Sequence, residues 1–135
     1  MITLTKALEV GVAKIDMQHR ELVDRLNDVM AMGGKSVTKE ETAKTLDLLG
    51  EYVVRHFGDE EALQKKSNYP KYDWHKEQHQ GFIKEFKELK KEFAANGQST
   101  KFTMDLNKTM VNWIVRHIKS ADAELGKHLR SQGMT

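Results

Sequence analysis

Residues 52–82 read YVVRHFGDEEALQKKSNYPKYDWHKEQHQGF, and two pairs of metal-type side chains occur in them at the same spacing. His56 precedes Glu60 by four residues, and His75 precedes His79 by four residues. Four residues advance an α-helix by about 400°, so the members of each pair lie on one face, one turn apart. Side chains placed in this way can hold one metal ion or two neighbouring ions.

The hydrophobic pattern predicts four helices along the whole chain, because apolar positions recur at steps of three and four in four segments. Residues that start or stop helices separate these segments. The expected boundaries are an N-cap at Asp16 and a stop at Gly33–Gly34, a capping box from Thr38 to Glu41 and a stop at 65–68, a start at Pro70 and a stop at Asn96–Gly97, and a start near Thr100. We therefore expect an all-α, up-down-up-down, left-handed four-helix bundle, with residues 1–13 as an N-terminal arm.

The composition fits one domain spanning residues 1–135 and narrows its chemistry and surroundings. There is no cysteine, so any metal must be held by nitrogen and oxygen rather than by sulfur. The net charge is only +2 with interspersed signs, which predicts no nucleic-acid partner. No apolar run approaches membrane-spanning length and no signal-peptide pattern opens the chain, so we expect no membrane partner and a cytoplasmic location.

Each expected helix carries metal-type side chains on its inward stripe. They are five imidazoles and two carboxylates: His19, His56, Glu60, His75, His79, His117 and Asp122. A lone buried histidine is usually a structural residue with a hydrogen-bond partner. Burying seven such groups together is costly unless they satisfy one another or a cation holds them, so the set indicates a metal site.

The donor set favours two transition-metal ions. Five imidazoles are too nitrogen-rich for Ca²⁺ or Mg²⁺, and seven donors exceed the need of one tetrahedral Zn²⁺. Imidazole suits iron, copper, nickel and zinc. If both carboxylates and one solvent-derived oxygen bridge two ions, the five histidines divide unequally. One ion then keeps an open position for a small ligand.

The spacing from His117 to Asp122 is five residues, which separates the two side chains by about 140° on a regular α-helix. If both side chains reach one metal pair, the helix contains a π-type turn, in which residues five apart align. The alternative is that the length of the side chains absorbs the offset. Unbroken α-helical hydrogen bonding through residues 117–122 would exclude the π-type turn.

Several polar residues near these motifs are interpreted without a ligand role. Gln18 is either a hydrogen-bond partner of His19 or, more simply, solvated. His128 is interpreted as a residue of the last helical turn, favoured there by the helix dipole. Asp16 is expected to cap its helix, and Asp59 is expected to face solvent. No Glu-x-x-His sequence occurs, which argues against the ferritin type of di-iron enzyme.

The donors occur as a single His followed by the motifs HxxxE, HxxxH and HxxxxD. The sequence segments that contain them are VGVAKIDMQH, HFGDEE, NYPKYDWHKEQH and WIVRHIKSADAEL. This set covers nearly the whole chain and resembles the hemerythrin family, in particular its bacterial single-domain members. The resemblance implies two iron ions. It also implies that Glu60 and Asp122 bridge them, together with an oxo or hydroxo group.

The resemblance further implies how the five histidines divide. One iron would be held by His75, His79 and His117. The other would be held by His19 and His56, and O₂ would bind reversibly at its open position when both irons are ferrous. The implied protein is an oxygen carrier, store or sensor rather than an enzyme, and an oxygen-using or signalling partner would be a separate protein. The alternative is a di-iron enzyme of the peroxidase or nitric-oxide-reducing type at the same site.

Reversible oxygen binding needs a dry pocket, because water or protons reaching the bound peroxide would release it and leave the irons oxidised. The candidates for its wall are Leu22, Phe57, Trp113 and Ile114. Three positions depart from the family pattern: Leu4 replaces a common tryptophan, Ile114 a frequent leucine, and Gln64 an apolar residue near a helix end.

Overall fold

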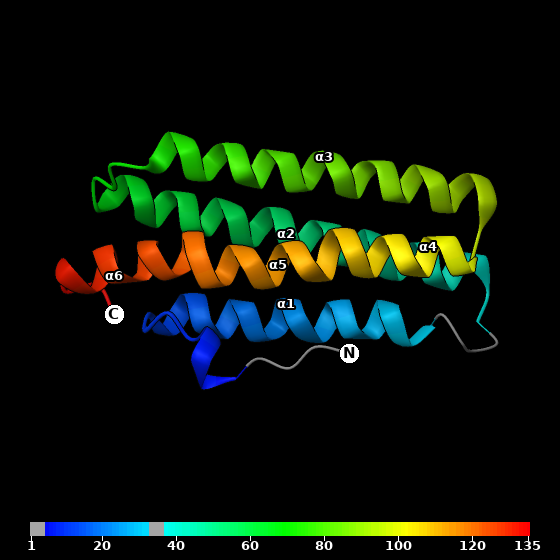
Figure 1. Cartoon of the computed structure of the whole chain (residues 1–135), viewed down its shortest axis with the longest axis horizontal. Coiled ribbons are helices and arrows are strands. Elements are labelled where there is room, and N and C mark those ends of the chain that lie inside the picture. Colours follow the sequence, from blue (N-terminus) through cyan, green and yellow to red (C-terminus); the bar gives the residue numbers. More distant parts are fainter. Residues whose placement is uncertain (1–4, 33–36) are drawn as a thin grey trace.

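The computed structural model describes residues 5–32 and 37–135, and the regular structure within those residues is helical. The first three rods are α1 (Ala13–Ala31), α2 (Lys39–Lys66) and α3 (Tyr72–Asn96). The fourth rod runs through α4 (Thr100–Asp105), η3 (Leu106–Val111), α5 (Asn112–His117), η4 (Ile118–Asp122) and α6 (Ala123–Ser131). Successive rods run antiparallel, and the described part of the arm, residues 5–12 with the short 3-10 helix η1 (Lys6–Leu8), lies outside α1 (Figure 1). The predicted all-α four-helix bundle is confirmed.

Local capping chemistry explains where several helices begin and end. Thr38 Oγ1 accepts a hydrogen bond of 3.0 Å from the backbone N–H of Glu41, as the predicted capping box requires. Ser99 Oγ accepts one of 3.0 Å from the backbone N–H of Phe102 and starts α4. The third rod ends where predicted, because Gly97 has φ = 68°, a conformation that glycine adopts at little cost.

The predicted start of the first helix is wrong, because α1 begins three residues before Asp16. The Asp16 carboxylate instead accepts hydrogen bonds from the backbone N–H groups of Val10 at 2.8 Å and Gly11 at 3.2 Å. Asp16 therefore fixes the arm against the first turn of α1 rather than capping the helix. The predicted stop at Gly33–Gly34 and the departure at Leu4 lie outside the described residues.

Two apolar clusters fill the bundle. The larger draws on all four rods: Leu22, Leu26, Val29, Leu46, Leu49, Val53, Phe57, Phe82, Phe86, Leu89, Phe93, Phe102, Leu106, Met110, Val111, Ile114 and Ile118. The smaller joins the arm, the start of α1, the link between α2 and α3, and α6: Val10, Val12, Ile15, Tyr69, Leu125 and Leu129. The predicted metal donors come from the level of the bundle where the two clusters meet. Apolar packing on both sides therefore keeps these polar side chains away from water.

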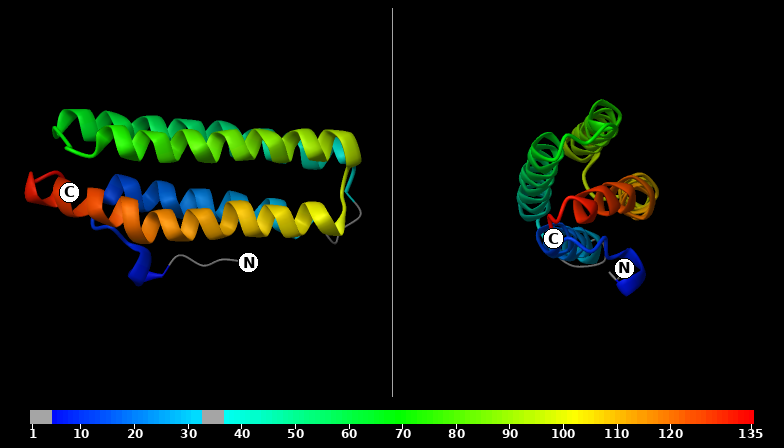
Figure 2. Two further views of the ribbon diagram at one scale, coloured as in Figure 1. Left: turned by 45° about the horizontal axis from the view of Figure 1, so that its top comes forward. Right: turned by 90° about the vertical axis from the view of Figure 1, so that its left-hand side faces the viewer.

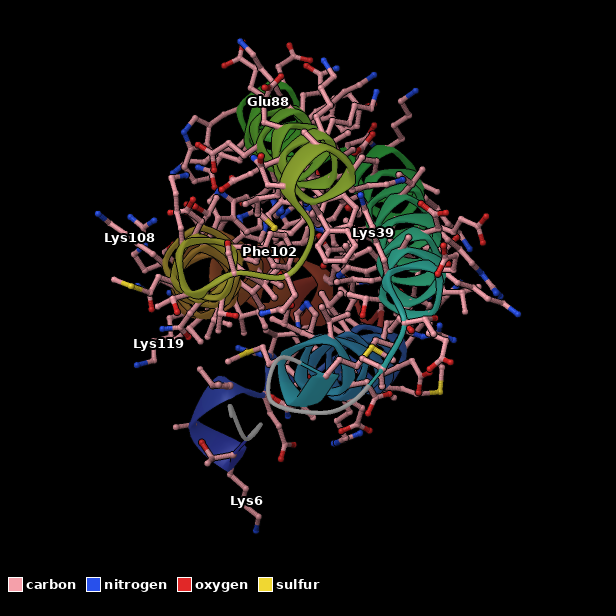
Figure 3. All side chains as sticks on the ribbon, turned by 90° about the vertical axis from the view of Figure 1, so that its right-hand side faces the viewer. Lys6, Lys39, Glu88, Phe102, Lys108 and Lys119 are labelled. Atoms are coloured by element: carbon pink, nitrogen blue, oxygen red, sulfur yellow. The ribbon has the colours of Figure 1, made fainter. Side chains whose placement is uncertain are left out.

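The four rods surround the core on all sides, as the view along the bundle shows (Figure 2). In the opposite end view, Phe102 points into the space between the rods, whereas Glu88 and Lys108 point outward (Figure 3). This pattern is that of an amphipathic helix with one apolar stripe facing its neighbours. None of the described helices is both long and apolar enough to cross a membrane.

Candidate metal centre

The structure brings all seven predicted donors together in one buried cluster between the four rods. Their ligand atoms form two overlapping groups, within each of which the atoms lie no more than 4.8 Å apart: Glu60, His75, His79, His117 and Asp122 in one, and His19, His56, Glu60 and Asp122 in the other. None of the seven residues is more than 4% exposed. Because Glu60 and Asp122 belong to both groups, the cluster has the form of two sites that share two carboxylates.

On one side of the cluster, two imidazoles face one oxygen of each carboxylate. His19 Nε2 lies 2.9 Å from Asp122 Oδ2 and 3.4 Å from Glu60 Oε2. His56 Nε2 lies 3.0 Å from the same Glu60 Oε2. The His56–Glu60 contact follows from the four-residue spacing on α2, which stacks the two side chains one turn apart.

On the other side, three imidazoles face the second oxygen of each carboxylate. Asp122 Oδ1 lies 2.9 Å from His75 Nε2 and 3.1 Å from His117 Nε2. Glu60 Oε1 lies 3.2 Å from His79 Nε2 and 3.4 Å from His75 Nε2. The Nε2 atoms of His75 and His117 are themselves only 3.0 Å apart. Each carboxylate thus offers one oxygen to each group of imidazoles.

A π-helical turn aligns the two donors of the fourth rod. Residues Ile118–Asp122 form this turn, η4, directly after His117. A π turn carries one more residue than an α turn, so it brings residues five apart onto the same face. The π-type explanation of the HxxxxD spacing is therefore confirmed. A second π turn, η3 (Leu106–Val111), was not predicted.

Gln18 is buried and holds an imidazole of the cluster, which corrects the prediction that it is solvated. Its Oε1 accepts a hydrogen bond of 2.8 Å from Nδ1 of His56, and not of His19. Its Nε2 donates to Asp59 Oδ2 at 2.7 Å, so Asp59 is not a simply solvated residue either. Because an accepting oxygen requires a proton on Nδ1, this contact leaves Nε2 of His56 free to face the cluster.

Two further side chains contact the outer ring nitrogen of a donor imidazole, and the sequence analysis did not predict either of them. Glu61 Oε2 lies 2.9 Å from His79 Nδ1, and Gln78 Oε1 lies 2.9 Å from His117 Nδ1. Both residues flank an inward stripe rather than lying on it, and polar residues in such positions are usually solvated. The sequence did contain a signal for this role. Glu61 follows the predicted ligand Glu60, Gln78 precedes the predicted ligand His79, and both side chains are long enough to reach the next rod.

The donor atoms that face the interior of the cluster fit a bound cation. His19 Nε2, His79 Nε2, both oxygens of Glu60 and Asp122 Oδ1 are buried and lie within 2.9–3.4 Å of other donor atoms, but the geometry of these contacts gives them no hydrogen bond among the described residues. Buried polar atoms without partners are costly, and a metal ion satisfies nitrogen and carboxylate oxygen together. Five imidazoles and two carboxylates also form the donor set that iron and other first-row transition metals accept.

Without metal, the carboxylates hold protons on two of the imidazoles. Burial opposes a charge on His19, but the neighbouring carboxylates of Asp122 and Glu60 outweigh it and raise the pKa of His19 to about 10. Burial also opposes a charge on His75, but Asp122 and Glu60 outweigh it and raise the pKa of His75 to about 9. Burial favours the neutral form of Glu60, yet the nearby imidazoles hold the pKa of this carboxyl well below its usual value. A metal ion would have to displace protons from this cluster.

Two of the four predicted pocket residues, Phe57 and Trp113, contact donor imidazoles. Three of the four are buried in the larger apolar cluster: Leu22, Phe57 and Ile114. Trp113 is half-buried at its edge. Phe57 stacks on His79 with ring centroids 3.8 Å apart, and Trp113 stacks on His117 at 4.3 Å. Aromatic faces therefore cover two imidazoles of the three-histidine group.

His128 and Gln64 lie outside both groups of donors. His128 Nε2 donates to the backbone oxygen of Ser67 at 2.9 Å, as a residue with a structural role does. Gln64 lies in the last turn of α2, near the helix end that the sequence indicated. Its complete burial was not predicted, and neither polar atom of its side chain has a partner among the described residues.

The fold and the donor cluster together define a four-helix bundle of the class that holds metal ions between its rods. The family model described as the hemerythrin HHE cation binding domain matches residues 10–129. The chain belongs to the hemerythrin family, as the resemblance of its motifs indicated.

Relatives and solved structures agree with this assignment. The chain is 32% identical over 114 residues to a bacteriohemerythrin of Methylococcus capsulatus, with 82% of each chain covered. It is 27% identical over 117 residues to a myohemerythrin of Theromyzon tessulatum, with 87% of this chain and 84% of that one covered. A crystal structure of wild-type hemerythrin matches it with a TM-score of 0.85 at 29% identity, covering 96% of this chain and 98% of that one.

Proposed function

We propose that this protein binds O₂ reversibly at a non-haem di-iron centre formed by the seven donors. The observation that carries the proposal is the orientation of the two shared carboxylates. Oε2 of Glu60 and Oδ2 of Asp122 face one group of imidazoles, whereas Oε1 and Oδ1 face the other. A carboxylate with one oxygen on each side is suited to bridge two ions, and the single chain supplies two such bridges.

The division of the imidazoles assigns different roles to the two positions. One position would be held by His75, His79 and His117, and the other by His19 and His56. The position with two histidines has one protein donor fewer, so it is the one that can accept an exogenous ligand. An iron pair held there, with an oxo or hydroxo group as a further bridge, would supply reversible binding of O₂ in its ferrous state.

The chain's own side chains orient the donors and exclude water. Gln18, Glu61 and Gln78 accept hydrogen bonds from the outer nitrogens of three imidazoles, which fixes the tautomer and turns each Nε2 toward the cluster. Leu22 and Ile114 are the proposed wall of the oxygen pocket, whereas Phe57 and Trp113 cover the three-histidine side. The apolar side chains of Leu22 and Ile114 would keep water and protons from a ligand bound in the pocket.

The decisive experiment is an oxygenation cycle on protein purified without oxygen. We expect two irons per chain, and a coloured adduct that forms on exposure of the reduced protein to air and disappears when O₂ is removed. Such a cycle identifies an oxygen carrier, store or sensor, with any oxygen-using or signalling partner a separate protein. Rapid conversion to a ferric form, with turnover when peroxide or nitric oxide and a reductant are supplied, would instead identify an enzyme at the same site.

The ligand set has its own test. Glu60→Ala and His79→Ala each remove one donor, and we expect both variants to lose iron and the visible bands of the adduct. His128→Ala is the matched control, because this histidine lies outside both groups and should leave the iron content unchanged. Two irons and unaltered bands in either donor variant would exclude the proposed ligands.

A further inference from the structure

A cleft on the outer side of the fourth rod leads to one of the donor imidazoles. It has a volume of about 350 Å³ and is lined by Gln78, Trp113, Arg116, His117 and Ser120. At 4%, His117 is the most exposed of the seven donors, each of the others being at most 1% exposed. The cluster therefore approaches solvent at this imidazole, on the side of the three-histidine group.

The His117 ring connects the cleft with the interior of the cluster. Its Nε2 lies 3.1 Å from Asp122 Oδ1, and its Nδ1 lies 2.9 Å from Oε1 of Gln78 in the cleft wall. Trp113 stacks on the same ring, with centroids 4.3 Å apart and planes inclined by 14°. Trp113 is half-buried, so one part of its indole meets the cleft while its face covers the imidazole. Two conjugated rings in contact thus lead from solvent to the donor atoms.

The charge of the cleft favours an anion. Arg116 is exposed at its rim, and no carboxylate among the described residues forms an ion pair with it. The rest of the polar lining is neutral, since it consists of the amide of Gln78 and the hydroxyl of Ser120 besides the imidazole. Arg116 Nε donates to the backbone oxygen of Asn112 at 3.4 Å, and Ser120 Oγ donates to the backbone oxygen of Arg116 at 2.7 Å. The remaining N–H groups of this guanidinium have no carboxylate partner among the described residues, so they attract small anions and can bind a carboxylate or similar oxyanion.

We propose that this cleft receives a small anionic one-electron donor, and that Trp113 and His117 conduct its electron to the metal pair. The inference rests on the proposed di-iron function. Each donor anion would lose one electron as one ferric ion becomes ferrous, so two donors would reduce the pair. An oxo bridge would take up one proton from solvent and become hydroxo, whereas a hydroxo bridge would need none. The electron enters beside the three-histidine position, whereas the exogenous ligand belongs at the position held by His19 and His56. The ferrous state is therefore restored without opening the ligand pocket to solvent.

Reduction kinetics of the ferric protein test this route. Dithionite delivers electrons as an anion and reduced methyl viologen as a cation. At low salt we expect Arg116→Glu to slow reduction by dithionite about tenfold, because the charge reversal repels the anion, and high salt to remove the difference. Reduction by methyl viologen should not be slowed. Lys108→Glu is the matched control, with the same charge change at an exposed residue of the same rod that does not line the cleft (Figure 3).

Fluorescence of the metal-free protein gives a second readout that does not depend on iron. In a Trp74→Phe background, Trp113 is the remaining indole, and iodide should quench it less in the Arg116→Glu variant than in the parent. Quenching by neutral acrylamide should be equal in the two proteins. Equal iodide quenching and equal dithionite rates would overturn the proposal, even if the variant still bound two irons and O₂. Failure of the parent protein to bind two irons would instead overturn the proposed function, while the iodide experiment would still decide whether the cleft attracts anions.

Discussion

Gln64 has a fully buried amide whose nitrogen and oxygen lack partners among the described residues. Leaving such a group unsatisfied costs about 1–3 kcal/mol. Methionine has a similar length and no strong hydrogen-bonding atom, so we expect Gln64→Met to raise the free energy of unfolding of the metal-free protein by about 1–3 kcal/mol. Urea unfolding measures the change. Gln80→Met, at an exposed position of α3, is the control and should change stability by less than about 0.5 kcal/mol. A loss of stability in Gln64→Met would show that the amide has a partner, such as a buried water.

The stability of the metal-free protein should depend on pH through His19 and His75. Their pKa values are raised from 6.5 to about 10 and about 9. A histidine whose pKa rises on folding stabilises the fold fully below its unfolded value, and that contribution is lost as pH rises through the folded value. We therefore expect the free energy of unfolding to fall between about pH 7 and 10. Urea unfolding of chelator-treated protein across this range measures it, and metal-loaded protein is the control with a smaller fall. A flat or rising profile in the metal-free protein would contradict this assignment.

At the scale of single residues, the convergence of the seven donors could be predicted because each lies on an inward stripe at helical spacing. The side chains that contact the outer nitrogens of the imidazoles could not be predicted. Gln18, Glu61 and Gln78 lie at the margins of their stripes, where the same residue types usually meet water. Only the packing of neighbouring rods decides that these three contact imidazoles instead.

Among the elements, η4 offers the sharpest test of how the fourth rod presents its donors. Deleting Lys119, an exposed residue of this π turn, leaves His117 and Asp122 four residues apart. On an α-helix that spacing keeps them within about 40° of each other, so we expect the deletion variant to retain two metal ions. Inserting an alanine after Lys119 turns Asp122 about 100° further and should abolish binding of the pair. Metal analysis gives the result, with far-UV circular dichroism as the check of folding. Loss of metal from a folded deletion variant would show that the π turn itself is required.

The boundaries of the elements were predictable where the signal is local. Thr38 and Gly97 act on the backbone within one turn, and the structure uses both as expected. Asp16 failed as a cap because its carboxylate finds the backbone of the arm, a contact that no local pattern reveals. The π turn η4 could be offered as one of two explanations because two donors mark its ends, whereas no such pair marks η3.

In the molecule as a whole, every rod contributes at least one donor, so bound metal ties all four together. A ligand that binds only the folded state at a thousand times its Kd adds about 4 kcal/mol of stability. We expect metal loading to raise Tm by about 10 °C or more, measured by calorimetry with and without chelator. Glu60→Ala should remove most of this rise. An equal rise in that variant would show that the metal stabilises the protein from another site.

The whole fold follows from the alternation of apolar stripes with short links, which is why the bundle could be predicted without further information. The cleft beside His117 could not, because it depends on how Trp113, Arg116 and Gln78 pack across two rods. The sequence therefore indicated which side chains converge, but not from which direction solvent reaches them.

Because the two carboxylates are shared, the binding of one iron ion should affect the binding of the other. A first ion that enters either group draws Glu60 and Asp122 into position and leaves their remaining oxygens unsatisfied, so the second ion should enter more readily than the first. When iron is scarce, the population should separate into empty and doubly filled molecules, with few that hold a single ion.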